Sequence, residues 1–478
     1  MPRRTKIIAT IGPSSDSPRD LEALIEAGMD VARIGLAHGT IEEQLERYYR
    51  IRAAARAVGR NVGILVDLPG PKVRAGSFGE NGGVELAPGN RVILRPGNGV
   101  STATEIEVDY EYLLADIHAG DRLMFGDGTV VVEIEEHCGD YLAGVVAHGG
   151  IVQGRPGVHI PSDRLRTSAP TERDLRLLDV FVDAGVDMVA LSFVRSAHDV
   201  RRIGTEPHPR GPLIVAKIET RAAVQNLEGI IAASGAIMVA RGDLGEEFEI
   251  EELPHLQKEI IAKCIAMGRP VITATQMLES MITAPSPTRA EATDVANAVF
   301  DGTSAVMLSA ETAIGHDPIE AVATMARIAG HADQRFPYDS WTARLTDRHV
   351  LGEAASLDSK MTDTITMAAW RAAAEVKANA IICITRSGFT ARSIARFRPQ
   401  ARVLAYSPDP RAVLQLSMSW GTTALGSQAH GAFTDMADWA VNDAKRQGLL
   451  RSGDVAVVVA GSRESSEATD TLRLVRVP

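Results

Sequence analysis

The strongest constraint on the fold is a set of short apolar runs, each of strand length, that recur along the first part of the chain. A polar turn and then a stretch with apolar residues at helical spacing follow each run, as in residues 18–27 and 319–329. The eight runs are residues 6–10, 31–34, 62–67, 187–192, 213–218, 236–240, 271–274 and 305–308. Several are apolar on both faces, which is typical of parallel strands covered on each side. Eight strands alternating with helices predict a (β/α)8 TIM barrel.

One gap interrupts this alternation between the third and fourth runs, and it is too long for a structureless loop. From residue 75 to 168 the composition shifts to glycine, proline and alternating strands, for example at 91–94 and 130–135. We therefore expect an inserted all-β lid domain, a β-barrel, over the mouth of the first barrel. It leaves from and returns to loops that connect barrel strands.

The pattern changes again after about Gln334, where a polar linker runs to Lys360. Helical stretches then alternate with the apolar runs 380–384, 403–406 and 455–460, which predicts a C-terminal α/β domain with an open sheet. The predicted domains are a barrel over 1–74 and 169–345, a lid over 75–168 and the C-terminal domain over 346–478.

Composition excludes several classes of protein. With 50 basic and 61 acidic residues and 4% aromatics, the chain has neither the basic footprint nor the stacking platforms of a nucleic-acid binder. Any anionic ligand must therefore be held by a local cationic site. The cysteines Cys138, Cys264 and Cys383 are far apart and fit buried free thiols better than disulfides or a zinc site. There is no apolar signal core and no run of about 18 apolar residues, so we expect a cytoplasmic protein without a membrane span.

Polar side chains stand at the ends of seven of the eight predicted strands, at the barrel edge where enzymes of this fold place reactive groups. They are Arg33, Asp67, Ser192, Lys217, Glu219, Arg241, Asp243, Thr275, Ser309 and Glu311. Any one of them alone could be a structural polar group. Seven adjacent strand ends that are all polar indicate a functional site.

Two of these carboxylates suggest a metal site. Glu219 and Asp243 leave neighbouring strands, which lie about 4.8 Å apart, so both can reach one ion. Without histidine or cysteine nearby, they suit a hard divalent cation, Mg²⁺ or Mn²⁺. The alternative is an ion pair with Lys217 or Arg241. Lys217 and Arg33 add positive charge beside the acidic pair, an arrangement that phosphoryl transfer needs.

Longer motifs resemble the pyruvate kinase family. They are AKIE at 216–219, MVARGDLG at 238–245, TATQMLESM at 273–281, PTRAE at 287–291, DVANAV at 294–299 and MLSAETA at 307–313. The resemblance covers the whole chain. It implies transfer of the phosphoryl group of phosphoenolpyruvate to ADP, giving pyruvate and ATP in glycolysis, by a homotetramer with a barrel, a β lid and a C-terminal effector domain.

The resemblance also implies roles for individual residues. Glu219 and Asp243 would hold the divalent metal, and Lys217 would neutralise the moving phosphoryl group and the enolate oxygen left behind. The substrate-binding residues would be Arg33, Ser192, Lys217, Gly242, Asp243 and Thr275. Arg33 would grip the phosphate, and the N–H groups of Gly242 and Asp243 would take the carboxylate, since glycine permits close backbone approach.

Proton transfer and nucleotide binding complete the implied site. Thr275 would lie near the methylene carbon that is protonated, with Ser309 and Glu311 as members of a proton relay. The nucleotide-side residues would be His38, Arg74 and, on the lid, Asp127. Closure of the lid would exclude water that could otherwise accept the phosphoryl group.

In two motifs the sequence departs from the family pattern. The family's Arg-Leu-Asn-Phe-Ser-His-Gly is RIGLAHG at 33–39, so Gly35 and Ala37 supply no side-chain oxygen for a potassium ion. The family's Asp-Thr-Lys-Gly-Pro-Glu-Ile-Arg is DLPGPKVR at 67–74, so an acid has become Lys72. Asp67 and backbone carbonyls alone would solvate K⁺ poorly, and Lys72 could supply the charge as a tethered ammonium. We therefore expect an enzyme that does not require K⁺; the alternative for Lys72 is a solvated surface lysine.

The stretch at 385–390 follows a predicted strand and opens a helix. Its Thr385, Ser387, Gly388 and Thr390 could form an anion nest, and the resemblance implies a sugar-phosphate effector site there. The nearby Arg392, Arg396 and Arg398 are compatible with such a site, although a basic helix face is usually solvated.

Two other functions remain open at the level of sequence. One is a metal-dependent lyase or aldolase acting on pyruvate-like enolates. The lid insert and Lys217 disfavour it. The other is a binding or regulatory protein that keeps the fold without turnover. The presence of Arg33, Lys217, Glu219 and Asp243 disfavours it.

Overall fold

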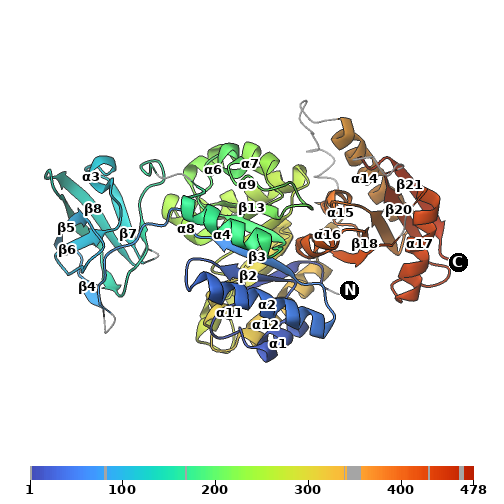
Figure 1. Cartoon of the computed structure of the whole chain (residues 1–478), viewed down its shortest axis with the longest axis horizontal. Helices are drawn as coiled ribbons and strands as arrows, with labels where there is room; N and C mark the ends of the chain where they lie inside the picture. The colour runs from blue at the N-terminus through green and yellow to red at the C-terminus, as the bar shows by residue number, and fades with distance from the viewer. Residues whose placement is uncertain are drawn as a thin grey trace.

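The computed structural model describes residues 3–79, 83–126, 128–166, 169–338, 340–341, 357–428, 431–461 and 468–478. Three bodies lie in a row along the longest axis, with the lid at one end, the barrel in the middle and the C-terminal domain at the other end (Figure 1). The limits of the three domains stay a prediction.

The central body is a closed barrel of eight parallel strands, as the sequence predicts. Around the barrel the order is β1-β16-β15-β14-β13-β12-β3-β2. The strands are β1 (Lys6–Thr10), β2 (Val31–Gly35), β3 (Gly63–Leu68), β12 (Met188–Leu191), β13 (Leu213–Ile218), β14 (Ala236–Ala240), β15 (Val271–Ala274) and β16 (Ala305–Leu308). β12 ends at Leu191, one residue before its predicted end at Ser192. The Ser192 hydroxyl donates to the Leu68 carbonyl at 2.8 Å.

Helices surround this barrel. They are α1 (Pro18–Ala27), α2 (Ile41–Val58), α4 (Glu172–Asp183), α5 (Ala197–Arg201), α6 (Arg221–Gln225), α7 (Leu227–Ala233), α8 (Arg241–Glu247), α9 (Leu253–Ala266), α10 (Arg289–Asp301), α11 (Ala310–Ala313) and α12 (Pro318–Gln334), with the 3₁₀ turn η1 (Glu279–Ile282). α2, α4, α5 and α10 each begin with a capping box, in which a serine or threonine and an acid three residues later satisfy each other's backbone N–H. This local chemistry sets where each of these helices starts.

The lid strands are β4 (Val84–Leu86), β5 (Arg91–Pro96), β6 (Glu105–Val108), β7 (Arg122–Phe125), β8 (Val130–His137), β9 (Leu142–His148), β10 (Gly150–Val152) and β11 (Val158–His159), with the short helix α3 (Leu113–Asp116). Among the described residues they form a six-stranded sheet, β11-β7-β8-β9-β5-β6, and a two-stranded sheet, β10-β4. The segment at 74–77 links the two edges of the larger sheet, because Arg74 bridges to Gly157 beside β11 and Ala75 bridges to Val108 in β6. The expected β-barrel stays a prediction.

The C-terminal domain has an open sheet in the order β19-β18-β17-β20-β21, as expected. Its elements are α14 (Leu357–Glu375), β17 (Ala380–Ile384), α15 (Phe389–Ala395), β18 (Arg402–Ser407), α16 (Pro410–Gln415), η2 (Leu416–Met418), β19 (Thr422–Gly426), α17 (Phe433–Arg446), β20 (Val455–Ala460) and β21 (Thr471–Arg476). β21 is antiparallel to β20, which the sequence did not predict. The described part of α14 starts at Leu357, so the last residues of the expected linker, 357–360, are helical.

The C-terminal domain closes the bottom of the barrel. Met418 packs into the barrel's inner core with Met188, Leu213 and other strand residues, and the Ser417 side chain and the Leu414 carbonyl lie against Gly63 at the start of β3. The carboxyl ends of the strands therefore face away from this domain and toward the lid (Figure 1). No helix in the described part of the chain is long and apolar enough to cross a membrane. The three cysteines are free, and Cys264 and Cys383 are buried.

Candidate active site

Lys217, near the carboxyl end of β13, is the centre of a charged cluster at the lid end of the barrel. Its Nζ lies 2.6 Å from Glu219 Oε1 and 3.6 Å from Asp67 Oδ1, and donates to Ser192 Oγ at 2.8 Å. Burial favours the neutral amine, but Asp67, Glu219 and Asp243 outweigh it and raise the pKa of Lys217 above its ordinary value. Lys217 is therefore a fixed ammonium at the carboxyl edge.

Asp67, which is 4% exposed, joins this ammonium to Arg33 on the neighbouring strand β2. Arg33 Nε donates to Asp67 Oδ2 at 2.8 Å, and Arg33 Nη1 donates to Thr10 Oγ1 at 3.0 Å. Burial alone would raise the pKa of Asp67, but Lys217 and Arg33 hold it below its usual range. The Asp67 carboxylate thus has two cationic partners.

Glu219 and Asp243 are the predicted metal ligands. Glu219 is 1% exposed, and its Oε2 accepts the Phe193 N–H at 2.7 Å. Its Oε1 forms the ion pair with Lys217 but receives no well-directed hydrogen bond. Burial raises the pKa of Glu219 to about 7, because Lys217 only partly offsets the burial and the repulsion from nearby Asp243. The alternative ion pair of Glu219 with Lys217 is present, whereas Arg241 pairs with Asp294 at 2.6 Å.

The donor set fits a hard divalent cation. Glu219 and Asp243 are close enough to repel each other, and a hard divalent cation binds and stabilises such paired carboxylates. No cluster of three or more histidine, cysteine, aspartate or glutamate residues able to hold a metal occurs within the described ranges. The remaining ligands would have to be water and substrate oxygens.

Thr275 follows β15 in a strained backbone conformation, with φ of 65°, and Gln276 has φ of 52°. Thr275 Oγ1 accepts the Gly242 N–H at 2.8 Å, so the first turn of α8 and this loop are joined. The Arg241 guanidinium donates to the carbonyls of Thr275 at 2.6 Å and Gln276 at 3.1 Å. We expected Arg241 only as a strand-end residue or an ion-pair partner, and no pattern in the sequence links it to this loop.

Ser309 and Glu311 follow β16. The Glu311 carboxylate is buried and accepts the N–H of Leu278 at 3.1 Å and of Ser309 at 2.6 Å. Both its oxygens are therefore used to fasten η1 to the end of β16. A part in proton transfer stays a prediction for both residues.

The nucleotide-side residues His38 and Arg74 lie close enough to interact, together with Lys72. Partial burial and then these two cations lower the pKa of His38, so it is neutral near pH 7. The exposed Lys72 side chain runs toward Gly157 in the returning lid segment and lines a small cleft with Asp243. Asp127 lies outside the described residues.

A contact that the sequence did not reveal joins the lid to α8. His159 on β11 lies 3.1 Å from Glu246 Oε2 through Nδ1 and 3.4 Å from Glu247 Oε1 through Nε2. The N–H and hydroxyl of Ser162 both donate to Glu247. The lid is thus attached to the helix that carries Asp243.

Three of the four predicted effector residues, Thr385, Ser387 and Gly388, lie between β17 and α15, and Thr390 is in the first turn of α15. Thr385 Oγ1 accepts the Gly388 N–H at 3.1 Å, and the Thr390 hydroxyl pairs with that of Thr469 at 2.7 Å. Both threonines are buried, whereas Ser387 lines a cavity. Two of the three hydroxyls in this set are therefore engaged within the domain itself.

The charged groups lie at the carboxyl edge of a closed (β/α)8 barrel, on the side of the inserted lid. This is where enzymes with this fold place their active sites. A sequence profile described as "Pyruvate kinase, barrel domain" matches residues 2–322, and one described as "Pyruvate kinase, alpha/beta domain" matches residues 363–475. The chain therefore belongs to the pyruvate kinase family.

Similar proteins agree with the profiles. The chain is 39% identical to a pyruvate kinase of Bacillus licheniformis, over 99% of this chain and 80% of that one. It is 38% identical to a pyruvate kinase of Clostridium acetobutylicum, over 99% of both chains. A crystal structure of a pyruvate kinase from Cryptosporidium parvum matches with a TM-score of 0.89 at 33% identity, covering 100% of this chain and 96% of that one.

Membership decides between the functions left open by the sequence. The chain is a phosphotransferase with pyruvate kinase activity in glycolysis, and the family uses a divalent metal with phosphoenolpyruvate and ADP. A lyase or aldolase, or a protein without turnover, is not supported.

Proposed function

We propose that phosphoryl transfer takes place around Lys217, with Glu219 and Asp243 as the protein ligands of Mg²⁺ or Mn²⁺. The observation that carries this is the pair of neighbouring carboxylates, Glu219 and Asp243, beside the Lys217 ammonium, which lies 2.6 Å from Glu219 Oε1. The cation, when bound, supplies charge neutralisation for the phosphoryl and enolate oxygens. Lys217 stays charged throughout, so it can stabilise the negative charge that develops on the enolate oxygen without moving a proton.

The other substrate-binding residues act by orientation. Arg33 is held against Asp67 and Thr10, which leaves its remaining N–H donors for the phosphate. Ser192 fixes the Lys217 ammonium through their hydrogen bond. The N–H groups at 242–243 receive the substrate carboxylate, and Thr275, fixed to Gly242, lies on the side from which the methylene carbon is protonated.

The test is an ATP-forming assay with phosphoenolpyruvate, ADP and Mg²⁺ or Mn²⁺ varied independently. Lys217→Met should abolish turnover at any metal concentration. Asp243→Asn should raise the metal concentration needed for half-maximal rate, because one charged ligand is lost. A variant of Glu219 or Asp243 with an unchanged metal requirement would refute the ligand assignment.

We further propose that the enzyme does not require K⁺. The support is that Asp67 already has Arg33 at 2.8 Å and Lys217 at 3.6 Å as cationic partners, while Gly35 offers no side-chain ligand. Lys72, whose side chain lines the same small cleft as Asp243, adds a tethered charge beside the site. Activity in tetramethylammonium buffer should be unchanged by added K⁺, and Lys72→Glu should create a dependence on K⁺. Strong stimulation of the unaltered enzyme by K⁺ would refute the proposal.

The remaining assignments extend the same function. His38, which follows β2 of the barrel, and Arg74, which lies where the chain enters the lid, bind the nucleotide. Closure of the lid excludes water from the site. The loop that holds Ser387 belongs to a sugar-phosphate effector site, in a cytoplasmic homotetramer. Candidate sugar phosphates should shift the substrate concentration at half-saturation, and no shift would refute the effector site. Analytical ultracentrifugation should give the mass of four chains, and any other mass would refute the homotetramer.

A further inference from the structure

The carboxylate of Glu247 is buried at the end of α8 and has no part in the chemistry proposed above. Glu247 is 7% exposed and is the last residue of the helix that carries Asp243. Its Oε1 accepts the Ser162 N–H at 2.9 Å, and its Oε2 accepts the Ser162 hydroxyl at 3.0 Å. His159 Nε2 lies 3.4 Å from Oε1. Both oxygens of this carboxylate are therefore held by the segment in which the lid returns to the barrel.

Glu247 also contacts the segment that follows Glu219. The Arg221 N–H at the start of α6 donates to Glu247 Oε2 at 3.4 Å, and the Arg221 guanidinium lies 4.3 Å from the centre of the Phe248 ring. Arg221 follows Glu219 by two residues, and Asp243 lies one helical turn before Glu247. A single carboxylate thus lies next to the lid and to both segments that carry the proposed metal ligands.

A second lid contact reaches the preceding residue of α8. His159 Nδ1 lies 3.1 Å from Glu246 Oε2, so each nitrogen of the imidazole ring has a glutamate of α8 beside it. Glu246 lines the small cleft that also includes Asp243. His159 is paired with Met124 across strands β11 and β7, which connects these contacts to the larger sheet of the lid. A movement of this sheet relative to α8 must therefore displace the two glutamates or break their contacts.

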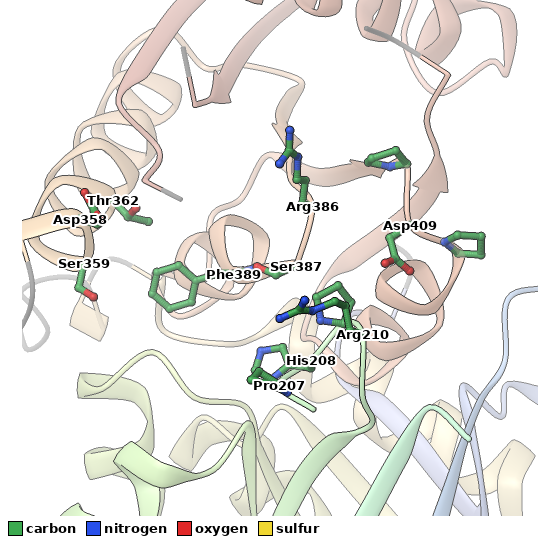
Figure 2. A pocket seen from close by; sticks show the side chains of 13 residues that line it. Pro207, His208, Arg210, Asp358, Ser359, Thr362, Arg386, Ser387, Phe389 and Asp409 are labelled. Carbon is green, nitrogen blue, oxygen red and sulfur yellow. The ribbon is translucent and has the colours of Figure 1, made fainter. Parts of the chain in front are cut away.

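The two junctions of the barrel with its neighbouring domains differ in how tightly they are closed. Figure 2 shows the junction with the C-terminal domain, where the barrel loop with His208 and Arg210 lines a cavity of about 1040 Å³. At the lid junction the Glu247 carboxylate receives three protein donors and is almost excluded from solvent. A buried carboxylate that loses its donors is destabilised, so Glu247 favours one position of the returning lid segment relative to α8.

We propose that Glu247 is a positioning residue for the metal site, which couples the position of the lid to the placement of Asp243 and Glu219. This role depends on the ligand assignment proposed above for these two carboxylates. Mg²⁺ demands near-ideal octahedral geometry, so a small displacement of α8 against the segment after Glu219 weakens its binding. Glu247 acts through the segments that it joins, because its oxygens are engaged by Ser162 and Arg221. By reciprocity, metal binding stabilises the lid contacts to the same extent.

The test is a direct titration of the full-length enzyme with Mn²⁺, in which electron paramagnetic resonance measures the free ion. Glu247→Ala should raise the dissociation constant for Mn²⁺ by about tenfold, the size expected when a residue that orients a metal ligand is removed. Glu247→Gln should restore most of the affinity, because the amide oxygen can still accept the Ser162 N–H.

Asp333→Ala is the matched control, since it removes a buried carboxylate with a similar set of donors at the opposite end of the barrel. Asp333 is 3% exposed and accepts the N–H groups of Arg4 at 2.7 Å and Thr5 at 2.9 Å, together with the Thr5 hydroxyl at 2.8 Å. The Mn²⁺ affinity of this variant should equal that of the unaltered enzyme.

Hydrogen exchange distinguishes the coupling from a general loss of stability. Mn²⁺ should slow exchange at residues 158–162 of the unaltered enzyme, and this protection should be lost in Glu247→Ala. Ser162→Ala keeps the carboxylate and removes one lid donor, so it should raise the dissociation constant for Mn²⁺ by about threefold. This variant decides the question if Glu247→Ala does not fold.

The outcomes separate this role from the ligand assignment. Normal Mn²⁺ affinity in folded Glu247→Ala, or in Ser162→Ala where the former does not fold, would refute the positioning role. If Asp243→Asn binds Mn²⁺ weakly in the same experiment, the ligand assignment stands. Normal affinity in Asp243→Asn would refute the ligand assignment and the positioning role with it. A loss of affinity in Asp333→Ala as large as that in Glu247→Ala would show a general effect of stability, which also refutes the positioning role.

Discussion

The most informative perturbation of the site is Arg241→Lys, since Arg241 is a positioning residue that carries none of the predicted chemistry. Its guanidinium lies 2.6 Å from the Thr275 carbonyl and 2.6 Å from Asp294 Oδ2. Thr275 and Gln276 both have positive φ, which costs on the order of 1–3 kcal/mol for each residue. Hydrogen bonds from a charged donor stabilise by about 1.5–3 kcal/mol each, so these bonds are of the size needed to hold the strained turn.

A lysine can keep the ion pair with Asp294 but cannot also reach the loop carbonyls. We expect the Thr275 loop to relax, and a displacement of about 1 Å at a reacting group lowers kcat by roughly 100-fold. The Michaelis constant for ADP should stay near its original value, because the nucleotide side is untouched. The assay is steady-state ATP formation.

Asp294→Asn is the control, because it weakens the ion pair of Arg241 and leaves the carbonyl contacts in place. Its kcat should stay close to that of the unaltered enzyme. If Arg241→Lys folds cooperatively and keeps full kcat, or if Asp294→Asn loses as much as Arg241→Lys, the positioning role is refuted.

Three further predictions concern the cluster and the lid. Lys217→Met leaves the buried carboxylates of Asp67 and Glu219 without their shared cation. The free energy of unfolding, measured with urea, should therefore fall by about 3–5 kcal/mol. An unchanged unfolding midpoint would show that these ion pairs do not stabilise the fold. The pKa of Asp67 is depressed in the folded state, so its stabilisation is present above the unfolded pKa of about 3.9 and is lost as pH falls through the folded value. The difference in stability between the enzyme and Asp67→Asn should therefore be largest near neutral pH and shrink in acid, and a difference that is constant with pH contradicts this. His159→Ala removes the contact of β11 with α8, so hydrogen exchange should increase in these two elements but not in the barrel strands; unchanged exchange contradicts the attachment.

The barrel could be predicted from the sequence because its strands are buried on both faces. Five of the eight predicted runs have the observed bounds, and the other three differ by one residue at one or both ends. Strand ends of a barrel converge by topology alone, so the grouping of Lys217, Glu219 and Arg33 followed from their position along the chain.

The contacts that fix the site could not be predicted in this way. Arg241 donates to backbone carbonyls more than thirty residues further along the chain. Every residue has a backbone carbonyl, so the sequence does not show which ones an arginine will bind. His159 meets α8 only because the lid returns to the barrel at that point. The bridges of Arg74 to Gly157 and of Ala75 to Val108, at the two edges of the lid sheet, could not be predicted either, because alternation shows the number of strands better than their edge pairing.

One dication held between Glu219 and Asp243 beside the Lys217 ammonium is central to the proposed function. A crystal of the enzyme grown with Mn²⁺ and oxalate, with diffraction recorded above the manganese absorption edge, measures this directly. We predict an anomalous peak that has one oxygen of each carboxylate as a ligand. A peak elsewhere, or carboxylates turned apart with no ion between them, would contradict the account.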